Sequence, residues 1–293
     1  MGSFLKNFKK RDIMTVKKLK TDLLKMFFIT FPYLYISLNY YRYRGKFPKL
    51  KDPKNLSEII LQQIYTGKIN KYKNFVDKIK VRDFIKNMGY EEILPKVYGI
   101  WEDANNIEFD KFPERFVLKT NHGCGEHYIC KDKSKLNEAV ARQLMDISVS
   151  TEYGLTETQY HSIKPLIYCE EYIDDGTGNL PIDYKFMCLD GEIKSILIVT
   201  NRETEYKLKT YDIDWEEQDF ITPKFKYPES IKRPKNLNEM IAIAKKLSKE
   251  FDFVRVDLYD TGKKIYFGEL TFTPHAGIMS YFTQNALEEM GRK

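Results

Sequence analysis

Phe253-Val-Arg-Val-Asp-Leu-Tyr259 and Ile265-Tyr-Phe-Gly-Glu-Leu-Thr271 are two apolar segments separated by the turn Asp260-Thr-Gly-Lys263. Their β-branched and aromatic residues, together with the glycine-containing turn, predict a β-hairpin. Each segment carries one acid, Asp257 or Glu269, and a carboxylate among apolar side chains is costly to bury unless a cation offsets its charge. Magnesium is commonly held by one or two carboxylates and substrate phosphates. The hairpin therefore predicts a Mg²⁺ site beside a bound nucleotide.

The polar residues of this hairpin are expected on one face. Arg255 and Asp257 are two residues apart, as are Glu269 and Thr271, and residues two apart in a strand point to the same side. The opposite face would carry the apolar side chains Val254, Val256, Leu258, Leu270 and Phe272. The four polar groups form either a ligand site or a structural network of ion pairs, and the hairpin alone leaves both interpretations open.

Lys119 ends another apolar segment, Phe116-Val-Leu-Lys119, and precedes the loop Thr120-Asn-His-Gly-Cys-Gly-Glu126. Glycines let backbone N–H groups approach an anion, and a lysine adds a point charge for phosphate oxygens. Because the lysine precedes the glycines, the order is not that of a Walker loop. The segment is either a phosphate site or an ordinary turn between strands whose lysine reaches water.

Further polar residues lie at the ends of predicted strands. Glu170-Glu-Tyr-Ile173 is typical of a hinge whose backbone pairs with an adenine edge, or of a solvated strand end. Asp183 and Lys185 share a strand face. Arg202 is a candidate phosphate ligand, and His275 is either a base or a structural histidine. Taken singly, a residue of this kind is more often a surface charge than a site residue.

The composition is that of a soluble protein of one or two domains, with 42% of the 293 residues hydrophobic and 31% charged. Four cysteines form no C-x-x-C pair and no secretory signal opens the chain, which favours a reducing cytosol. The spacing of the cysteines to His122 and His127 matches no zinc finger, so zinc is not expected.

Basic residues are concentrated near the N-terminus. Residues 1–50 contain twelve Lys or Arg against Asp12 and Asp22, a balance of +10, whereas the remaining residues carry 36 basic and 40 acidic side chains, or −4. This acidic body argues against nucleic-acid binding. Residues 26–41 are uncharged and aromatic, but they are too short for a membrane span and Pro32 interrupts them. They form either a segment on an anionic membrane or a helix packed on the body.

The other elements show no regular β-α-β order. Apolar residues recur at three-to-four spacing over 53–99, 136–149 and 237–251, which predicts helices. Strands are predicted at 116–119, 128–130, 166–173, 184–189 and 193–200. These elements predict an α+β fold with largely antiparallel sheets.

In this order the motifs resemble the ATP-grasp superfamily, and more closely its TupA-like branch, which is linked to teichuronopeptide and other cell-surface polysaccharide synthesis. The similarity covers about residues 53–285 and rests on six ordered segments: Asp77-Lys-Ile-Lys-Val-Arg82, Phe116-Val-Leu-Lys-Thr-Asn-His-Gly123, Cys169-Glu-Glu-Tyr-Ile173, Asp183-Tyr-Lys-Phe186, Arg255-Val-Asp257 and Glu269-Leu-Thr-Phe-Thr-Pro274. The resemblance implies an ATP-grasp fold, in which two α+β subdomains enclose ATP. The implied divisions are a basic, aromatic N-terminal segment at 1–52, a helical region at 53–110, a small subdomain at 111–175 and a catalytic subdomain at 176–293.

The resemblance also implies roles for individual residues. The implied ATP-binding residues are Lys78 and Lys119 at the phosphates, Asn121, His122, Gly123 and Gly125 in a loop above them, Glu170, Glu171, Tyr172 and Ile173 at the adenine hinge, and Asp183. Asp257, Glu269 and Thr271 would hold Mg²⁺. Many members carry asparagine where this chain has Thr271, so a single Mg²⁺ is expected. The candidate catalytic residues are Arg255, Lys185 and Arg202.

ATP-grasp enzymes typically activate a carboxylate as an acyl phosphate, which an amine then attacks. The resemblance therefore implies a C–N ligase that uses ATP and Mg²⁺ to join an amino acid or amine to an acidic sugar of a surface polysaccharide. It would act in the cytoplasm, with residues 1–50 in peripheral contact with the inner face of the membrane. Two alternatives are a glycosyltransferase using a metal and a nucleotide sugar, and a non-catalytic membrane scaffold. The paired lysines and the Glu-Glu-Tyr-Ile hinge favour ATP, whereas a scaffold would bind no nucleotide.

Overall fold

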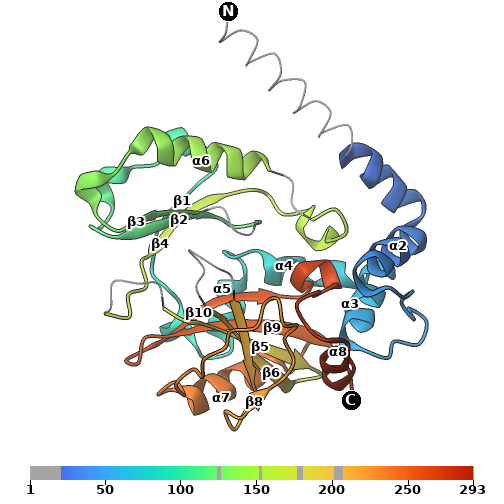
Figure 1. Ribbon diagram of the computed structural model, residues 1–293. Helices are drawn as coiled ribbons and strands as arrows, with labels where there is room; N and C mark the ends of the chain where they lie inside the picture. The colour runs from blue at the N-terminus through green and yellow to red at the C-terminus, as the bar shows by residue number, and fades with distance from the viewer. Residues whose placement is uncertain (1–20, 124–126, 152–153, 177–180, 201–206, 293) are drawn as a thin grey trace, which may run out of the picture.

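The computed structural model describes residues 21–123, 127–151, 154–176, 181–200 and 207–292, which form a small and a large antiparallel sheet (Figure 1). The small sheet has the order β1-β4-β2-β3 and the large sheet the order β10-β9-β5-β6-β7-β8. The small sheet consists of β1 (Val97–Trp101), β2 (Phe116–Thr120), β3 (His127–Cys130) and β4 (Ile167–Glu171). The large sheet consists of β5 (Asp183–Leu189), β6 (Glu192–Thr200), β7 (Lys207–Tyr211), β8 (Glu217–Gln218), β9 (Phe253–Asp260) and β10 (Ile265–Thr271). The predicted α+β class with antiparallel sheets is confirmed.

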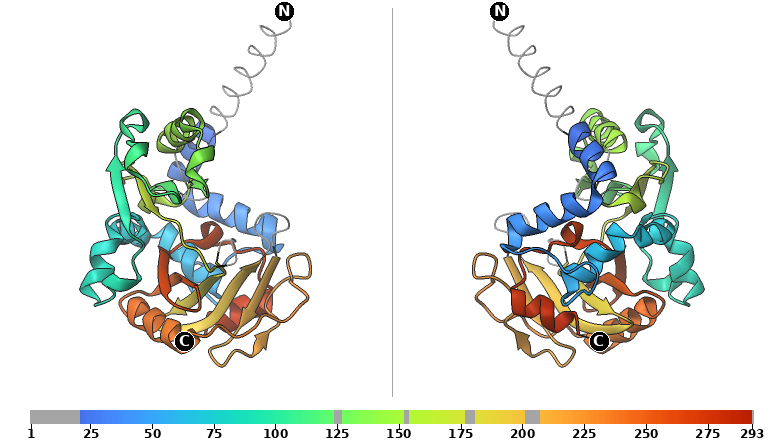
Figure 2. Two further views of the ribbon diagram at one scale, coloured as in Figure 1. Left: turned by 90° about the vertical axis from the view of Figure 1, so that its left-hand side faces the viewer. Right: turned by 90° about the vertical axis from the view of Figure 1, so that its right-hand side faces the viewer.

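The helices cover these sheets. They are α2 (Pro32–Arg44), α3 (Leu56–Tyr65), α4 (Lys73–Val76), α5 (Val81–Asn87), α6 (Glu138–Ser150), α7 (Leu237–Ser248) and α8 (Gln284–Met290). Short 3-10 turns are η1 (Lys68–Tyr72), η2 (Glu91–Ile93), η3 (Ala104–Asn106), η4 (Phe109–Lys111), η5 (Lys133–Lys135), η6 (Thr158–Tyr160) and η7 (Pro274–Gly277). The small sheet with α6 lies above the large sheet in each view (Figures 1 and 2).

In the small sheet, residues of alternate parity point to opposite sides. Phe116 and Leu118 of β2 pack with Ala141 and Met145 of α6 in one buried cluster. Lys119 must then point away from α6, because successive side chains in a strand face opposite sides. The helix itself begins at Asn137, whose side chain accepts a hydrogen bond from the N–H of Val140.

The large sheet is covered on both faces. Tyr184, Phe186 and Cys188 of β5 belong to the cluster that contains the apolar face of α7. Met187 and Leu189 belong instead to the cluster built by α2, α3 and α8. This second face also carries the polar end of β5, Asp183 and Lys185, by the same alternation.

The region 53–99, which the sequence predicts to be helical throughout, ends in a strand instead of a helix. Residues 97–101 form β1, which pairs with β4 at the edge of the small sheet. The apolar spacing that suggested a helix therefore breaks off before Val97, where strand pairing satisfies the backbone. Predicted helix 237–251 is likewise shorter, because α7 ends at Ser248.

The N-terminal helices are attached to the segment that follows β10. Residues 21–30 are helical, and α2 begins at Pro32, where a proline costs no intrahelical hydrogen bond. At the end of α2, the guanidinium of Arg44 donates to the carbonyls of Ile278, Met279 and Phe282 at 2.8, 2.6 and 2.8 Å. No helix of the described ranges is long and apolar enough to cross a membrane.

Replacing Arg44 with methionine is expected to lower the free energy of unfolding by about 3 kcal/mol, because three carbonyls lose a charged donor. The matched control is Arg42→Met, an exposed position two residues earlier in the same helix, which should cost less than about 0.5 kcal/mol. Urea unfolding of both variants and the parent measures the difference. Equal midpoints for the two variants would show that Arg44 does not hold this segment.

Candidate active site

A β-bulge at Gly268 brings the acid of β10 onto the same face as the acid of β9. The register pairs Phe267 with Leu258 and then Glu269 with Asp257, so Gly268 is an extra residue in β10. Before the bulge, Ile265 and Phe267 enter the core under α7. After the bulge the alternation of side chains shifts by one residue. Leu270 and Phe272 now enter that core, and Glu269 faces the other side of the sheet. Without this inserted residue, Glu269 would point into an apolar core.

Alanine at position 268 is expected to destabilise the hairpin and weaken the site. Its Cβ would lie 3.0 Å from the backbone oxygen of Asp257 and 3.1 Å from the ring of Tyr259, an overpacking that costs about 1–3 kcal/mol. We expect lower stability in urea and weaker Mg²⁺-dependent ATP binding by calorimetry. The control Gly262→Ala lies in the turn of the same hairpin, where φ is +74° and no atom lies within 4 Å of the new Cβ. It should lose stability through backbone strain alone and keep its ATP affinity; equal loss of affinity in both variants would contradict the role of the bulge.

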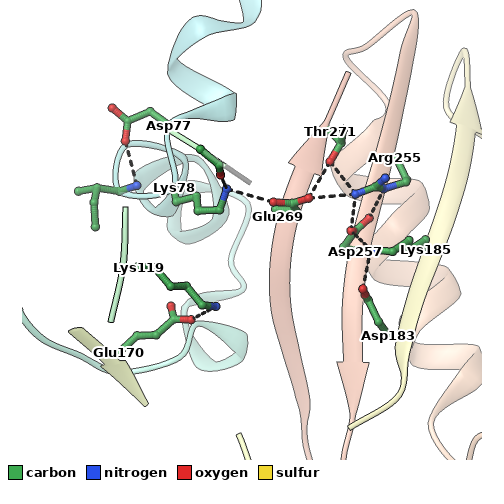
Figure 3. Close-up of polar contacts among 12 residues, drawn as sticks. Asp77, Lys78, Lys119, Glu170, Asp183, Lys185, Arg255, Asp257, Glu269 and Thr271 are labelled. Carbon is green, nitrogen blue, oxygen red and sulfur yellow. Dashed lines mark hydrogen bonds and ion pairs between the residues drawn. The ribbon is translucent and has the colours of Figure 1, made fainter. Parts of the chain in front are cut away.

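Arg255 is the centre of the polar face on the large sheet (Figure 3). Its Nε and Nη2 donate to the two oxygens of Asp257, each at 2.7 Å. Nη2 also donates to Glu269 Oε1 and Thr271 Oγ1, each at 2.9 Å, and Thr271 donates to Glu269 Oε1 at 3.0 Å. Asp257 and the neighbouring carboxylate outweigh the desolvation of the guanidinium and raise the pKa of Arg255. The predicted convergence of four polar groups on one hairpin face is confirmed.

Lys185 adds a second cation to this face. β5 pairs with β9 so that Lys185 lies opposite Asp257, and its ammonium forms ion pairs with Asp257 and, at 2.5 Å, with Asp183. Burial and the nearby Arg255 lower the pKa of Lys185, while Asp257 and Glu269 oppose that shift. The face thus carries two cations, Arg255 and Lys185, and three carboxylates. All five side chains project from the strands β5, β9 and β10.

Lys78 joins this network from a different part of the chain. The buried carboxylate of Asp77 accepts hydrogen bonds from the N–H groups of Ile79 and Lys80 at 3.0 and 3.2 Å, which shapes the turn. The Lys78 ammonium lies 3.2 Å from Glu269 Oε2 and donates to the carbonyl of Gly123 at 2.7 Å. Burial alone would raise the pKa of Glu269, but Lys78, Arg255 and Lys185 outweigh it and hold that pKa well below its ordinary value. Glu269 therefore stays ionised.

Lys119 and Glu170 form a pair on the small sheet, on the side away from α6. They come from neighbouring strands, with Lys119 opposite Tyr168 and Glu170 opposite Val117, and the ammonium donates to Glu170 Oε1. The Glu170 side chain is 9% exposed and that of Lys119 is 30% exposed. Figure 3 shows this pair near Lys78 and apart from the Arg255 cluster. The two predicted phosphate lysines come from different elements, Lys119 from β2 and Lys78 from the turn between α4 and α5.

The predicted phosphate loop is partly described. Asn121 is fully buried, and its side chain bonds the backbone at Lys164 and Leu166, at 3.2 and 2.8 Å. His122 is also buried, with Nε2 3.3 Å from the carbonyl oxygen of Thr151. The backbone of Asn121 accepts from Lys78 N–H at 3.0 Å. Among the predicted site residues, Gly125 and Arg202 lie outside the described ranges.

The predicted adenine hinge begins at the end of β4. Glu171 accepts hydrogen bonds from the Tyr266 hydroxyl at 3.2 Å and from the N–H of Lys96 at 3.1 Å, so it links the two sheets. The Tyr172 ring is buried, with the guanidinium carbon of Arg115 5.4 Å from its centre. Ile173 follows, beyond the last residue of the strand. Glu170 and Glu171 still pair with neighbouring strands, whereas Tyr172 and Ile173 follow the end of β4.

The loop after β10 contacts a segment that the sequence did not single out. Thr273 donates to Glu157 at 2.6 Å and accepts from Gln159 at 2.8 Å. Both partners precede β4, and burial raises the pKa of Glu157. No motif identifies them, because only the fold brings 157–159 to this loop.

His275 lies in the same loop. It has φ of +48°, and its ring lies 4.8 Å from that of Tyr281. Burial and Arg255 lower the pKa of His275, which favours the neutral imidazole.

A pocket of about 440 Å³ lies beside His122. Its apolar walls include Phe28 and Ile29 from the first helix, Val149 from α6, and Ile163. Four separate segments meet here, so the sequence pattern carries no signal for this pocket. It lies between His122 of the predicted phosphate loop and the first N-terminal helix.

The hairpin has the donor atoms that Mg²⁺ prefers. Asp257 and Glu269 supply carboxylate oxygens and Thr271 a hydroxyl, and Asp257 Oδ1 and Glu269 Oε2 each accept from one cation, which leaves a lone pair on each oxygen. Within the described ranges, no group of three His, Cys, Asp or Glu side chains is placed to hold a metal by itself. The donor set therefore fits an ion that also uses substrate phosphate oxygens.

Comparison with known proteins identifies one family. A family model described as TupA-like ATPgrasp matches residues 54–293. Similar solved structures are a D-alanine–D-alanine ligase from Bacillus anthracis, with 17% identity, a TM-score of 0.44 and coverage of 73% of this chain and 61% of that one, and an L-amino acid ligase from Bacillus licheniformis, with 14% identity, a TM-score of 0.48 and coverage of 90% and 57%. The chain spans about three fifths of the length of these ligases. A search of curated proteins found no match.

Proposed function

Because this chain belongs to the TupA-like ATP-grasp family, we propose that it is an ATP-dependent ligase that forms a C–N bond through an acyl phosphate. The observation that carries the proposal is the contact of Lys78 with Glu269 of the Arg255 cluster. Lys78 contacts both Glu269 and the loop at Gly123, so one cation bridges the small sheet's loop and the large sheet. Such a bridge suits the polyphosphate of ATP, with its adenine at the 170–173 hinge.

The proposed reaction proceeds in two steps. A carboxylate oxygen of one substrate attacks the γ-phosphorus of ATP, the bond to the β–γ bridging oxygen breaks, and ADP leaves. The amine of the second substrate then attacks the acyl carbon, loses a proton, and expels phosphate. Arg255 and Lys185 are placed to stabilise the charge that develops on the transferring phosphoryl group and on the tetrahedral acyl state.

Asp257, Glu269 and Thr271 would hold Mg²⁺, which offsets negative charge on the phosphates when bound. The cations Lys78, Arg255 and Lys185 keep Glu269 ionised, as its lowered pKa indicates. The neutral His275 lies in the loop beyond β10, and it is a candidate to accept the proton of the attacking amine.

For the substrates, we propose an amino acid or amine and an acidic sugar of a surface polysaccharide, joined in the cytoplasm at the inner face of the membrane. The resemblance to the TupA-like branch supports the polysaccharide role. The buried cation Lys185 supports an anionic substrate. In a glycosyltransferase, the alternative, the acid pair would bind a nucleotide sugar, and Lys78 and Lys119 would have no γ-phosphate to bind.

The test is ADP release with Mg²⁺, a panel of amino acids and a panel of uronic-acid glycans. We expect ADP release that requires both an amine and a carboxylate, with phosphate formed in equal amount. Mass spectrometry should then detect the amide product. Transfer of sugar from a nucleotide sugar without ATP would overturn the ligase and establish the glycosyltransferase.

A further inference from the structure

The N-terminal helices expose far more apolar surface than the rest of the molecule. Of the seventeen exposed large hydrophobic residues of the described ranges, eleven lie between positions 23 and 47. Met26 and Leu23 are 65% and 58% exposed, and Ile29, which also lines the pocket beside His122, is 76% exposed. A concentration of this kind marks an interaction surface rather than scattered apolar residues.

This surface is separate from the face that attaches α2 to the body. Ile36 and Tyr40 are buried in the core shared with α3 and α8. Leu34, Leu38 and Tyr41, at spacing i, i+4 and i+7, are 46%, 47% and 49% exposed, and this spacing places them together on another side of the helix. The helix therefore has an apolar face for the core and a second apolar face towards solvent.

The segment that carries this outer face has an excess of positive charge. Residues 21–51 contain six Lys or Arg and a single acid, Asp22. Residues 1–20, whose structure is not described, add seven Lys or Arg and only Asp12 in sequence. Apolar and aromatic side chains beside lysines and arginines are the combination that binds an anionic bilayer surface.

We propose that helix 21–30 and α2 dock on an anionic membrane through this outer face, which includes Leu34, Leu38 and Tyr41. A second copy of the chain is disfavoured as the occupant, because a symmetric contact would bring two segments of the same positive charge together. Tyr41 on this face suits the boundary between headgroups and acyl chains. The inference rests on the proposed function for its location at the membrane, but its own observations are the exposed face and its charge.

Docking at this face would also orient the active site. Arg44 holds α2 to the carbonyls of 278–282, and the hydroxyl of Ser57 donates to Ile278 from α3 at 3.1 Å. This segment follows the loop of His275, next to the Arg255 cluster. Hydrogen bonds thus attach the membrane-facing helix α2 to residues 278–282, which follow the loop of His275.

Co-sedimentation of the full chain with vesicles tests the proposal. The vesicles are phosphatidylcholine alone or with about one third phosphatidylglycerol, at low and high salt, without nucleotide. We expect binding only to the anionic vesicles and weaker binding at high salt. The triple variant Leu34→Ser, Leu38→Ser and Tyr41→Ser should lower the partition coefficient at least about tenfold.

The matched control is the triple variant Ile100→Ser, Val140→Ser and Ile147→Ser, which replaces residues of similar exposure on the small sheet and α6 and should bind as the parent does. Failure of the parent to bind anionic vesicles, or equal loss in both triple variants, would overturn the proposal. A dimer seen by light scattering without lipid, and lost only in the outer-face variant, would assign the face to a second copy instead. Because vesicle binding is measured without ATP, its failure is distinguishable from a failure of the ligase assay.

Discussion

Asp257→Asn is expected to reduce amine-dependent ADP release at least about a hundredfold. Asp257 accepts hydrogen bonds from both Arg255 and Lys185 and is a proposed Mg²⁺ ligand. The substitution therefore removes a negative charge that contacts two cations and the proposed metal. The substitution should also lower the free energy of unfolding by about 3 kcal/mol, because two buried cations lose their shared carboxylate. Steady-state kinetics as a function of Mg²⁺ concentration, with urea unfolding in parallel, measures both effects.

The control for this variant lies on the same strand. Asp260→Asn alters a carboxylate at the end of β9 that bonds the side chain of Asn236 at 2.8 Å, away from the Arg255 cluster. It should lose some stability and keep the Mg²⁺ dependence of the parent. If Asp257→Asn lost only stability and retained its activity and Mg²⁺ dependence, the cluster would be a structural network, the alternative that the sequence left open.

Lys119→Met is expected to lower kcat/KM for ATP about a hundredfold, mainly through KM, because a cation at the phosphates contributes to binding. It also leaves Glu170, whose side chain is 9% exposed, without its ammonium partner, so stability should fall as well. The double variant Lys119→Met with Glu170→Gln separates these effects. Removing both charges should restore most of the stability but not the affinity for ATP.

Lys133→Met serves as the control, because Lys133 bonds the carbonyls of Asp110 and Phe112 at 3.0 and 2.6 Å, outside the site. Calorimetric titration with a non-hydrolysable ATP analogue measures affinity apart from turnover. If the double variant recovered ATP binding along with stability, Lys119 would serve only to neutralise Glu170. If Lys133→Met weakened ATP binding as much as Lys119→Met, the effect would not be specific to the site.

The local sequence pattern was sufficient to predict the closing hairpin of β9 and β10 and much of the small sheet. The two apolar segments around a glycine-containing turn predict a hairpin with Asp257 and Glu269 on one face, and the β9–β10 pairing confirms it. The strand ending at Lys119 was predicted in the same way and forms β2. By contrast, the sequence pattern predicts a helix where β1 forms, because a short edge strand has too few residues for its period to show.

The sequence by itself determined which residues carry charge into apolar strands, and therefore that Arg255, Asp257 and Glu269 needed one another or a ligand. Burial of charge is costly wherever it occurs, so this inference required no coordinates. Only the tertiary structure decided how these groups meet. The extra residue Gly268 turns Glu269 out of the core, and the fold brings Lys78 to 3.2 Å from it. The face to which a residue points after a bulge depends on the register of the two strands. Contacts between distant segments depend on packing. The pattern of residues along the sequence specifies neither.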